Sequence, residues 1–585
     1  MNNYAQVKPD QIQSLIGNAT IVAIDTETTG LDWVRDRLVY VQFSVEKGHS
    51  FLLDARKFIP ELQAVLNNPS IGKVFHKASF DVLFLMNAGY TVTNIAFDTK
   101  IAAYLLDNTQ DNGLKDLTRK YLRVENVIEF NDIVPKAARA KKGQPKPPAT
   151  TIEDAKIEDV VNYACADSDH TIQLNNLFAP EIQRQGFADL MAMELEVQDI
   201  LIQMVRNGCK LDLEKADKIR IQVDKLQCEA EKKAKSYIGE VNLSSPKQLI
   251  EALYVKLGLP VVGVSKTTGS PSTDEKCLTF LKHEHPVIEH LLEYAKYSKL
   301  LGTYLEPLPA IVDQNDCLHG SFNQTVTDTG RLSSSGPNLQ NIPVKTALGK
   351  DFRKCFISRF KGGKLLVADY SQIEVRILAH LSQDKLLLKA LADGVDTHAL
   401  TASLLLGVKL KNVTKEQRTI GKTFNFGILF GEGAEKLSID AHISLATAQT
   451  YLETFFKKYK GVAEFKEAQI QKVEKCGYVE TILGRRLYIP KWKFAGTRAI
   501  NYPVQGSAAD VVKKAMITVA RKFKEEAYKS LLILQVHDEL VWDVVPEEQD
   551  LLKIIVPQLM DNVVKITGEL PADVKLVDSW GEMKD

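Results

Sequence analysis

The sequence predicts a multidomain α/β and α+β protein, on three observations. The chain has 585 residues, more than one compact domain usually holds. Strand-like and helix-like stretches alternate up to about residue 185, as in an α/β unit with one mixed sheet. Long amphipathic helices follow up to about residue 299, and mixed patterns return after Asp316.

The N-terminal and middle elements follow from their apolar patterns. Residues 21–24 and 38–43 form apolar runs typical of strands. Segment 135–148 combines Lys, Arg, Gly and Pro without an apolar face, which favours a mobile loop. Helices are predicted within 195–205 and 215–235, where apolar residues recur at helical spacing.

The C-terminal elements place acidic residues at the ends of strands. A buried strand over 364–368 is expected to end on Asp369, and a helical block covers roughly 385–475. Two β-rich runs, 531–536 and 539–544, are joined by two polar residues. They predict a hairpin with a carboxylate at its tip.

Composition narrows the functional classes. Hydrophobic residues make up 45% and charged residues 25%, which excludes wholesale disorder. The chain has 74 basic and 74 acidic residues, so its net charge gives no sign of a nucleic-acid partner. A local basic cleft remains compatible with this balance. No apolar run reaches the roughly 18 residues that span a bilayer, and the start lacks a signal peptide. The seven cysteines form no CxxC pair, which predicts a reduced intracellular protein without disulfides or zinc.

The first candidate site is acidic. Asp25 and Glu27 are two apart on a predicted strand and point to the same face. Like charges repel unless a cation lies between them, and carboxylates suit Mg²⁺ or Mn²⁺. This spacing alone is equally compatible with a solvated surface. Asp81 follows on a predicted helix, and Tyr163 and Asp167 lie one helical turn apart on another.

The second candidate site joins Asp369 to the hairpin residue Asp538. A strand end and a hairpin tip can bring the two carboxylates together, where they could hold two metals that bridge a triphosphate. The alternative is that each is an ordinary turn or helix-cap residue.

A stripe of four residues lies between these acids in the sequence. Arg418, Lys422, Phe426 and Phe430 fall at successive steps of four, on one helical face. Two cations followed by two aromatic rings would meet first phosphates and then a sugar or base. The alternative is that both rings are core and both cations are solvated.

Taken together these segments resemble the family A DNA polymerases of the large-fragment type. The N-terminal acids resemble the three blocks of proofreading 3′→5′ exonuclease domains. The polymerase resemblance rests on segments 329–334, 337–343, 369–376, 418–431, 501–510 and 535–540.

The resemblance implies a ribonuclease H-like exonuclease domain followed by a right-hand polymerase domain. The exonuclease would cover 1–190 and the thumb 191–320. The palm would consist of 321–390 and 496–585, with the fingers at 391–495.

The resemblance also implies residue roles. Asp25, Glu27, Asp81 and Asp167 would hold two metals, and Tyr163 would orient the attacking water. Asp369 and Asp538 would hold the polymerase metals, with Glu539 as a supporting acid. The expected nucleotide contacts are Arg418, Lys422, His398, Phe426, Phe430, Gln372 and Glu374. Among them, Lys422 is also a candidate proton donor to pyrophosphate. Glu374 would exclude a ribose 2′-hydroxyl. The expected DNA contacts are Arg331, Asn338, Gln340, Asn341, Asn501, Gln505 and His537.

The sequence departs from the family pattern at three places. The family often has Asn at or beside His76, and it usually has Tyr where Phe430 stands. Arg498 lies one residue nearer Asn501 than the usual Arg. Basic residues at 485, 486, 491 and 493 are equally compatible with template phosphates and with a solvated surface.

The resemblance implies a primer-dependent DNA polymerase with proofreading, acting in replication or repair with two Mg²⁺ per site, for which Mn²⁺ could substitute. Its expected partners are primer–template DNA and dNTPs; accessory proteins leave no readable signal, and no membrane contact is expected. We predict a monomer in the cytoplasm of a bacterial or phage-infected cell, at the nucleoid, or in an organelle if a targeting segment was removed. The alternatives are a single-subunit RNA polymerase, which Glu374 disfavours, a nuclease with an idle DNA-binding module, and a structural clamp.

Overall fold

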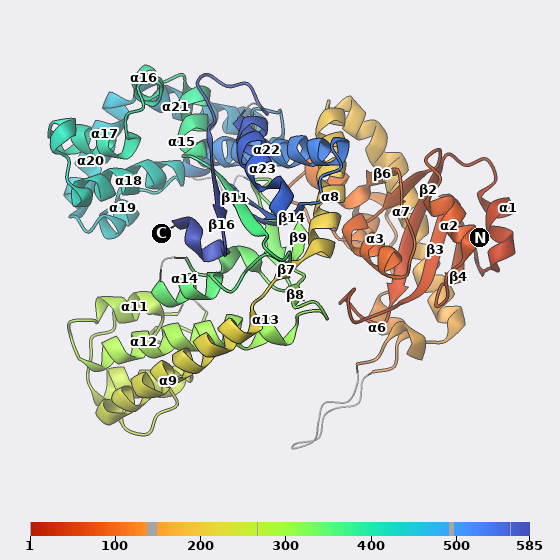
Figure 1. Ribbon diagram of the computed structural model, residues 1–585, viewed down its shortest axis with the longest axis horizontal. Helices are drawn as coiled ribbons and strands as arrows, with labels where there is room; N and C mark the ends of the chain where they lie inside the picture. The colour runs from red at the N-terminus through yellow and green to blue at the C-terminus, as the bar shows by residue number, and fades with distance from the viewer. Residues whose placement is uncertain are drawn as a thin grey trace.

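The computed structural model describes residues 2–136, 149–265, 267–344, 346–490, 496–561 and 563–584. Figure 1 shows the N-terminal unit, in red and orange, on one side of a central sheet, with a helical arm and a group of teal helices on the other. No helix in these ranges is both long and apolar enough to cross a membrane. Positions 137–148 of the predicted loop, and the basic residues at 491 and 493, lie outside the described residues.

A six-stranded mixed sheet forms the centre of the N-terminal unit, in the order β1-β4-β3-β2-β5-β6. Strand β2 is antiparallel to β3 and parallel to β5, which confirms the predicted mixed sheet. The strands are β1 (Asn3–Gln6), β2 (Ile21–Thr28), β3 (Leu38–Glu46), β4 (His49–Asp54), β5 (Gly72–Phe75) and β6 (Ile95–Asp98). Helices that contact the sheet are α3 (Ala78–Asn87), α4 (Thr99–Leu106) and α7 (Ile157–Arg184).

Helix α8 (Ala188–Asn207) connects the N-terminal unit to the rest of the chain. It packs on α3 on one side and on β14 and α22 on the other, so the predicted boundary at residue 190 falls inside it. The arm that follows has its own small hydrophobic core, separate from the main one. Its helices are α9 (Leu213–Ile238), α10 (Pro246–Ile250), α11 (Glu275–Phe280) and α12 (Val287–Leu300).

The central sheet is antiparallel, in the order β14-β15-β11-β16. Its strands are β14 (Leu531–Val536), β15 (Glu539–Val544), β11 (Lys364–Tyr370) and β16 (Ala572–Val577). The predicted hairpin is confirmed with its bounds. The strand expected to end on Asp369 instead continues to Tyr370, because pairing with Ala572 of β16 extends it by one residue.

The predicted helical block is confirmed as a set of short helices. They are α16 (Lys385–Ala392), α17 (Thr397–Leu406), α18 (Lys415–Leu429), α19 (Ala434–Asp440), α20 (Leu445–Lys458) and α21 (Lys460–Cys476). Helix α15 (Ile373–Ser382) precedes them; α22 (Gly496–Glu525) and α23 (Gln549–Asp561) follow. Helix α18 begins with a capping box, in which the side chains of Thr414 and Gln417 bond each other's backbone N–H groups.

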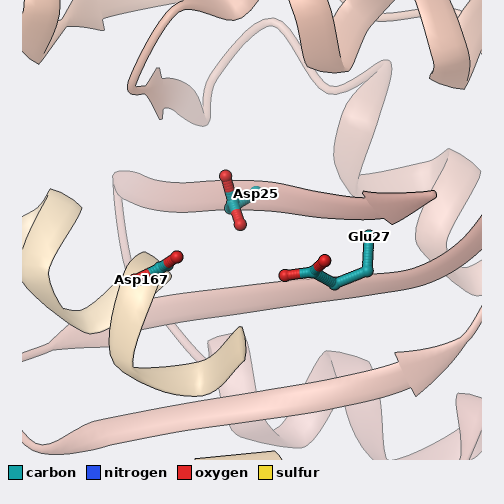
Figure 2. A group of neighbouring side chains, drawn as sticks. All are labelled: Asp25, Glu27 and Asp167. Atoms are coloured by element: carbon teal, nitrogen blue, oxygen red, sulfur yellow. The ribbon is translucent and has the colours of Figure 1, made fainter. Parts of the chain in front are cut away.

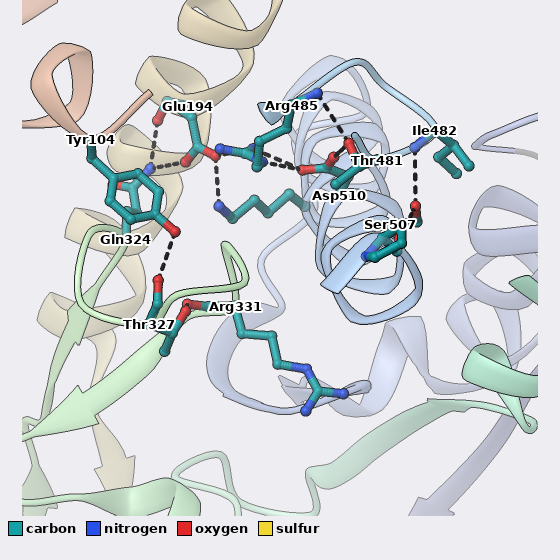
Figure 3. A network of polar contacts seen from close by, with 12 residues as sticks. Tyr104, Glu194, Gln324, Thr327, Arg331, Thr481, Ile482, Arg485, Ser507 and Asp510 are labelled. Atoms are coloured by element: carbon teal, nitrogen blue, oxygen red, sulfur yellow. Dashed lines mark hydrogen bonds and ion pairs between the residues drawn. The ribbon is translucent and has the colours of Figure 1, made fainter. Parts of the chain in front are cut away.

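A buried ion cluster ties α8 to the C-terminal half (Figure 3). The Glu194 carboxylate pairs with the Arg485 guanidinium and, at 2.6 Å, with the Lys513 ammonium. Arg485, expected to meet template phosphates or solvent, is instead buried, and it also pairs with Asp510 at 2.7 Å. Burial by itself would raise the pKa of Glu194, but Lys513 and Arg485 outweigh it and lower that pKa to about 2. Both cations thus face ionised carboxylates in the interior.

Two candidate active sites

Three carboxylates from distant parts of the N-terminal unit converge in the first site (Figure 2). Asp25 and Glu27 lie on β2 and Asp167 on α7, and ligand oxygens of the three come within 4.8 Å of one another. Burial raises the pKa of Asp25 and of Glu27 well above the usual range, and the neighbouring carboxylates raise both further. A buried set of oxygen donors with this repulsion fits a divalent cation.

Asp81 lies beside this group. It is buried on α3, and the Thr26 hydroxyl donates a 2.7 Å hydrogen bond to it. Burial raises its pKa to about 7, and its charge in turn raises the pKa of Asp25. The structure therefore places Asp81 near the other acids, although not within the group of three.

Two side chains that contact these acids were not predicted from the sequence. The Lys115 ammonium forms an ion pair with Asp167 and lies 4.6 Å from the centre of the Tyr163 ring. The Gln42 amide, on the neighbouring strand β3, donates to Asp25. Burial, with the charges of Glu27 and Asp167, raises the pKa of Tyr163, so its hydroxyl keeps its proton at neutral pH.

In the second site Asp538 lies in the turn between β14 and β15, next to the end of β11 that carries Asp369. Asp369 pairs with Glu539 across β11 and β15, and the Tyr370 N–H donates to the Asp538 carbonyl at 3.4 Å. The Glu539 carboxylate accepts a 2.6 Å hydrogen bond from the Trp580 indole, so it is engaged away from the hairpin tip. Asp369 and Asp538 are therefore neighbours along the backbone, and Mg²⁺ usually binds one or two protein carboxylates together with substrate phosphates.

The hairpin tip opens into a cavity of about 370 Å³ between the arm and the sheet. Lys299 and Tyr304 from the arm side line it, as do Gln340 and Asn341. His537 and Asp538, at the hairpin tip, also line it. Predicted DNA-contacting residues and a predicted metal ligand therefore face one space.

The predicted stripe lies on α18 and just beyond its end. The Phe426 and Phe430 rings stack at 6.0 Å between centroids, and the Lys422 ammonium lies 5.8 Å from the Phe426 ring. Phe430 is 46% exposed and caps the helix, so it is not a core residue. Arg418 donates a 2.6 Å hydrogen bond to Asp396, at the start of α17.

His398 lies behind the stripe, with its ring 5.5 Å from that of Phe426. It is 4% exposed, and its Nδ1 is 3.0 Å from the Asn425 amide. Burial, helped by Arg418, lowers its pKa to about 4. The imidazole is therefore neutral at pH 7 and can donate a hydrogen bond without adding charge.

Glu374 is held beside the second site by Arg331. The two side chains form an ion pair, and Glu374 is only 7% exposed. Burial raises the pKa of Glu374; Arg331 opposes this effect and Asp538 adds to it, so the three groups lie close together. Gln372 accepts a 2.6 Å hydrogen bond from the Thr397 hydroxyl, which links α15 to α17.

The remaining predicted DNA contacts differ in how freely they can reach a ligand. Asn338 caps a helical turn through the Gln340 N–H, and the Gln340 amide donates to Gln535 at 2.9 Å. The Asn501 amide donates to the Leu429 carbonyl at 2.8 Å. Asn341 and His537 are exposed and Gln505 is half-buried.

Comparison with known proteins gives consistent matches along the chain. Residues 213–582 match the sequence model of DNA polymerase family A, and residues 4–183 match that of a 3′-5′ exonuclease. DNA polymerase I of Pseudomonas aeruginosa is 36% identical and that of Borreliella burgdorferi 34% identical, over 96% and 99% of this chain. The chain spans 64% of the length of each of these relatives. The POL domain of Pol1 from M. smegmatis, solved with DNA primer-template and dNTP, aligns with a TM-score of 0.86 and 30% identity, covering 99% of each chain.

Proposed function

The chain belongs to DNA polymerase family A, and on that basis we propose that it is a template-directed, primer-dependent DNA polymerase with 3′→5′ proofreading. The observation that carries the proposal is the pairing of β11 with β15, which sets Asp369 beside Asp538. A DNA template and dNTPs as substrates suit replication or repair by a monomer at the nucleoid of a bacterial or phage-infected cell.

In the polymerase site we propose that Asp369 and Asp538 hold two Mg²⁺, with Mn²⁺ able to replace them. Bound ions would supply charge neutralisation at the triphosphate and activation of the primer 3′-hydroxyl. Arg418 and Lys422 bind the triphosphate, and neutral His398 donates a hydrogen bond to it. The Phe426 ring packs against the sugar, while Glu374 occupies the space that a ribose 2′-hydroxyl would need.

In the exonuclease site we propose that Asp25, Glu27, Asp81 and Asp167 hold the metals. Bound ions would supply an activated water and stabilisation of the leaving oxygen. The protonated Tyr163 hydroxyl orients that water. The Lys115 ammonium balances the carboxylates through Asp167 and thereby keeps the acidic group stable.

Gel-resolved primer extension tests the proposal. With matched primer ends and dNTPs we expect extension, with rNTPs very little, and without nucleotides we expect shortening of mispaired ends. Extension that prefers rNTPs would favour the RNA polymerase alternative, and shortening without extension would favour a nuclease with an idle binding module.

Replacing Lys115 with Met is expected to tighten metal binding at the exonuclease site. The ammonium competes with a divalent cation for Asp167, so its removal should lower the Mn²⁺ dissociation constant about tenfold. Electron paramagnetic resonance titration of Mn²⁺ measures this in an Asp369→Ala background, which removes a ligand of the other site.

Lys120→Met is the matched control for this titration, since Lys120 also lies over a tyrosine ring, at 5.1 Å, but bonds the uncharged Gln110. Equal Mn²⁺ affinity in the Lys115 and Lys120 variants would contradict the competition.

Replacing Phe430 with Tyr is expected to change misincorporation about threefold. The added hydroxyl can form a hydrogen bond at the template position while the ring keeps its stacking on Phe426. Single-nucleotide misincorporation in an Asp25→Ala, Glu27→Ala background isolates this effect from proofreading. Phe456→Tyr, on α20, serves as the control, and a Phe430→Tyr variant with parental misincorporation and rate would refute the idea.

A further inference from the structure

One loop of the polymerase region (residues 213–582) is hydrogen-bonded by side chains of the exonuclease segment (residues 4–183). The loop connects β9 (Ser321–Asn323) with β10 (Ser333–Ser335). The Tyr104 hydroxyl donates to the Thr327 carbonyl at 2.7 Å, as Figure 3 shows, and the Asn108 amide donates to the Asp328 carbonyl at 3.0 Å. The Asn112 amide donates to the Thr325 carbonyl at 2.9 Å. Three side chains of the exonuclease segment thus fix three carbonyls of one short loop.

The same loop also contacts the C-terminal half. Tyr502 on α22 donates a 2.9 Å hydrogen bond to the Asp328 carboxylate. Gly330 has a φ of +80° and packs so closely on Arg485 that a Cβ there would lie 3.1 Å from its Cδ. The loop is therefore clamped between the exonuclease segment and the buried ion cluster, with little freedom to shift.

The clamped loop leads directly to the proposed sugar-selecting residue. Thr327 donates a 2.7 Å hydrogen bond from its hydroxyl to the Arg331 carbonyl, and the Arg331 guanidinium holds Glu374. In Figure 3 the Arg331 side chain extends from this loop away from the ion cluster. A continuous path of contacts therefore runs from Tyr104 through Thr327 and Arg331 to Glu374.

We propose that Tyr104, Asn108 and Asn112 are positioning residues for nucleotide selection, acting through the 325–331 loop on Arg331 and Glu374. The inference rests on the proposed function, in which Glu374 excludes the ribose 2′-hydroxyl. The exonuclease segment then has a second role, independent of its own chemistry: it sets the position of the residue that distinguishes deoxynucleotides from ribonucleotides. Other hydrogen bonds join the two regions elsewhere, such as the one from the Tyr488 N–H to the Asn108 side-chain oxygen at 2.7 Å. The three bonds to main-chain carbonyls differ from these because they converge on the segment before Arg331.

The test removes two of the donors without touching either active site. Tyr104→Phe with Asn112→Ala, in an Asp25→Ala, Glu27→Ala background, should lower the ratio of kcat/KM for dNTP to that for rNTP about tenfold. The matched control is Tyr121→Phe with Asn87→Ala, which removes one hydroxyl and one amide that bond Gln110 and Trp33 within the segment. Because the ratio is independent of the fraction of active protein, general destabilisation does not change it.

Two further measurements make the test decisive. Thr327→Val, made from the polymerase side, should lower the ratio about threefold. In a Glu374→Ala background the Tyr104 and Asn112 changes should have no further effect on the ratio, as expected for residues acting through Glu374. A ratio equal to that of the control, or an effect that persists without Glu374, would overturn the inference. A parent protein that incorporates neither nucleotide would instead overturn the proposed function and the inference with it.

Discussion

Replacing Asp369 with Ala is expected to lower primer extension at least about 10³-fold and to leave 3′→5′ degradation at the parental rate. Asp369 lies in an interior strand beside Asp538. The two acids paired with it do not replace it, because Glu539 on β15 is bonded to the Trp580 indole and Asp573 on β16 is exposed. Loss of one ligand from a two-metal site removes several kcal/mol of stabilisation from the transition state.

The reciprocal change, Asp25→Ala with Glu27→Ala, should abolish degradation and preserve extension. Both activities are measured on one labelled primer, with and without dNTPs. Asp578→Ala is the control, since this exposed acid pairs with Lys364 at the far end of β11. If either active-site variant lost both activities while remaining folded, the assignment of two separate sites would be wrong.

The second large effect is on stability. Replacing Glu194 with Ala should lower the free energy of unfolding by about 3–5 kcal/mol, because Arg485 and Lys513 would remain buried without that carboxylate. Urea unfolding followed by circular dichroism at pH 7 measures the loss. Since the pKa of Glu194 is lowered from 4.5 to about 2, its contribution is complete above pH 5 and declines as pH falls through that interval.

Glu196→Ala is a closely matched control for this measurement. Glu196 lies on the same helix two residues further on, but it pairs with Arg521 at the surface. Exposed pairs contribute about 1 kcal/mol or less. Similar losses of unfolding free energy in the two variants would mean that the buried cluster contributes no more to stability than an exposed ion pair.

Local patterns predicted the elements that carry the acidic side chains. The two runs flanking His537 and Asp538 form the expected hairpin, and Asp25 and Glu27 lie on the expected strand. Both follow from alternation of side chains along a strand, which is a property of adjacent residues. The partner of each strand depends on the packing of the whole chain. A strand end and a hairpin tip made the meeting of Asp369 and Asp538 possible, and the family resemblance made it expected.

The roles of Lys115 and Glu194 could not be predicted from local sequence patterns. Lys115 lies in the short helix α5 (Leu114–Leu117), far from Asp167 in the sequence, and nothing nearby distinguishes it from a surface lysine. Glu194 did carry a signal, because helical spacing puts it on the buried face of α8 with Leu190, Val197 and Leu201. An acid on such a face needs a cation, but only the folded chain identifies Arg485 and Lys513 as its partners.

The joint between Tyr104, Asn108, Asn112 and the 325–331 loop has a consequence for evolution. All three donors bond main-chain carbonyls, which every amino acid provides alike. The receiving side can therefore drift in sequence while the donors stay constrained. Such a contact produces no covarying pair of positions in an alignment. Its loss in a lineage would be visible only as substitutions at the three donor positions.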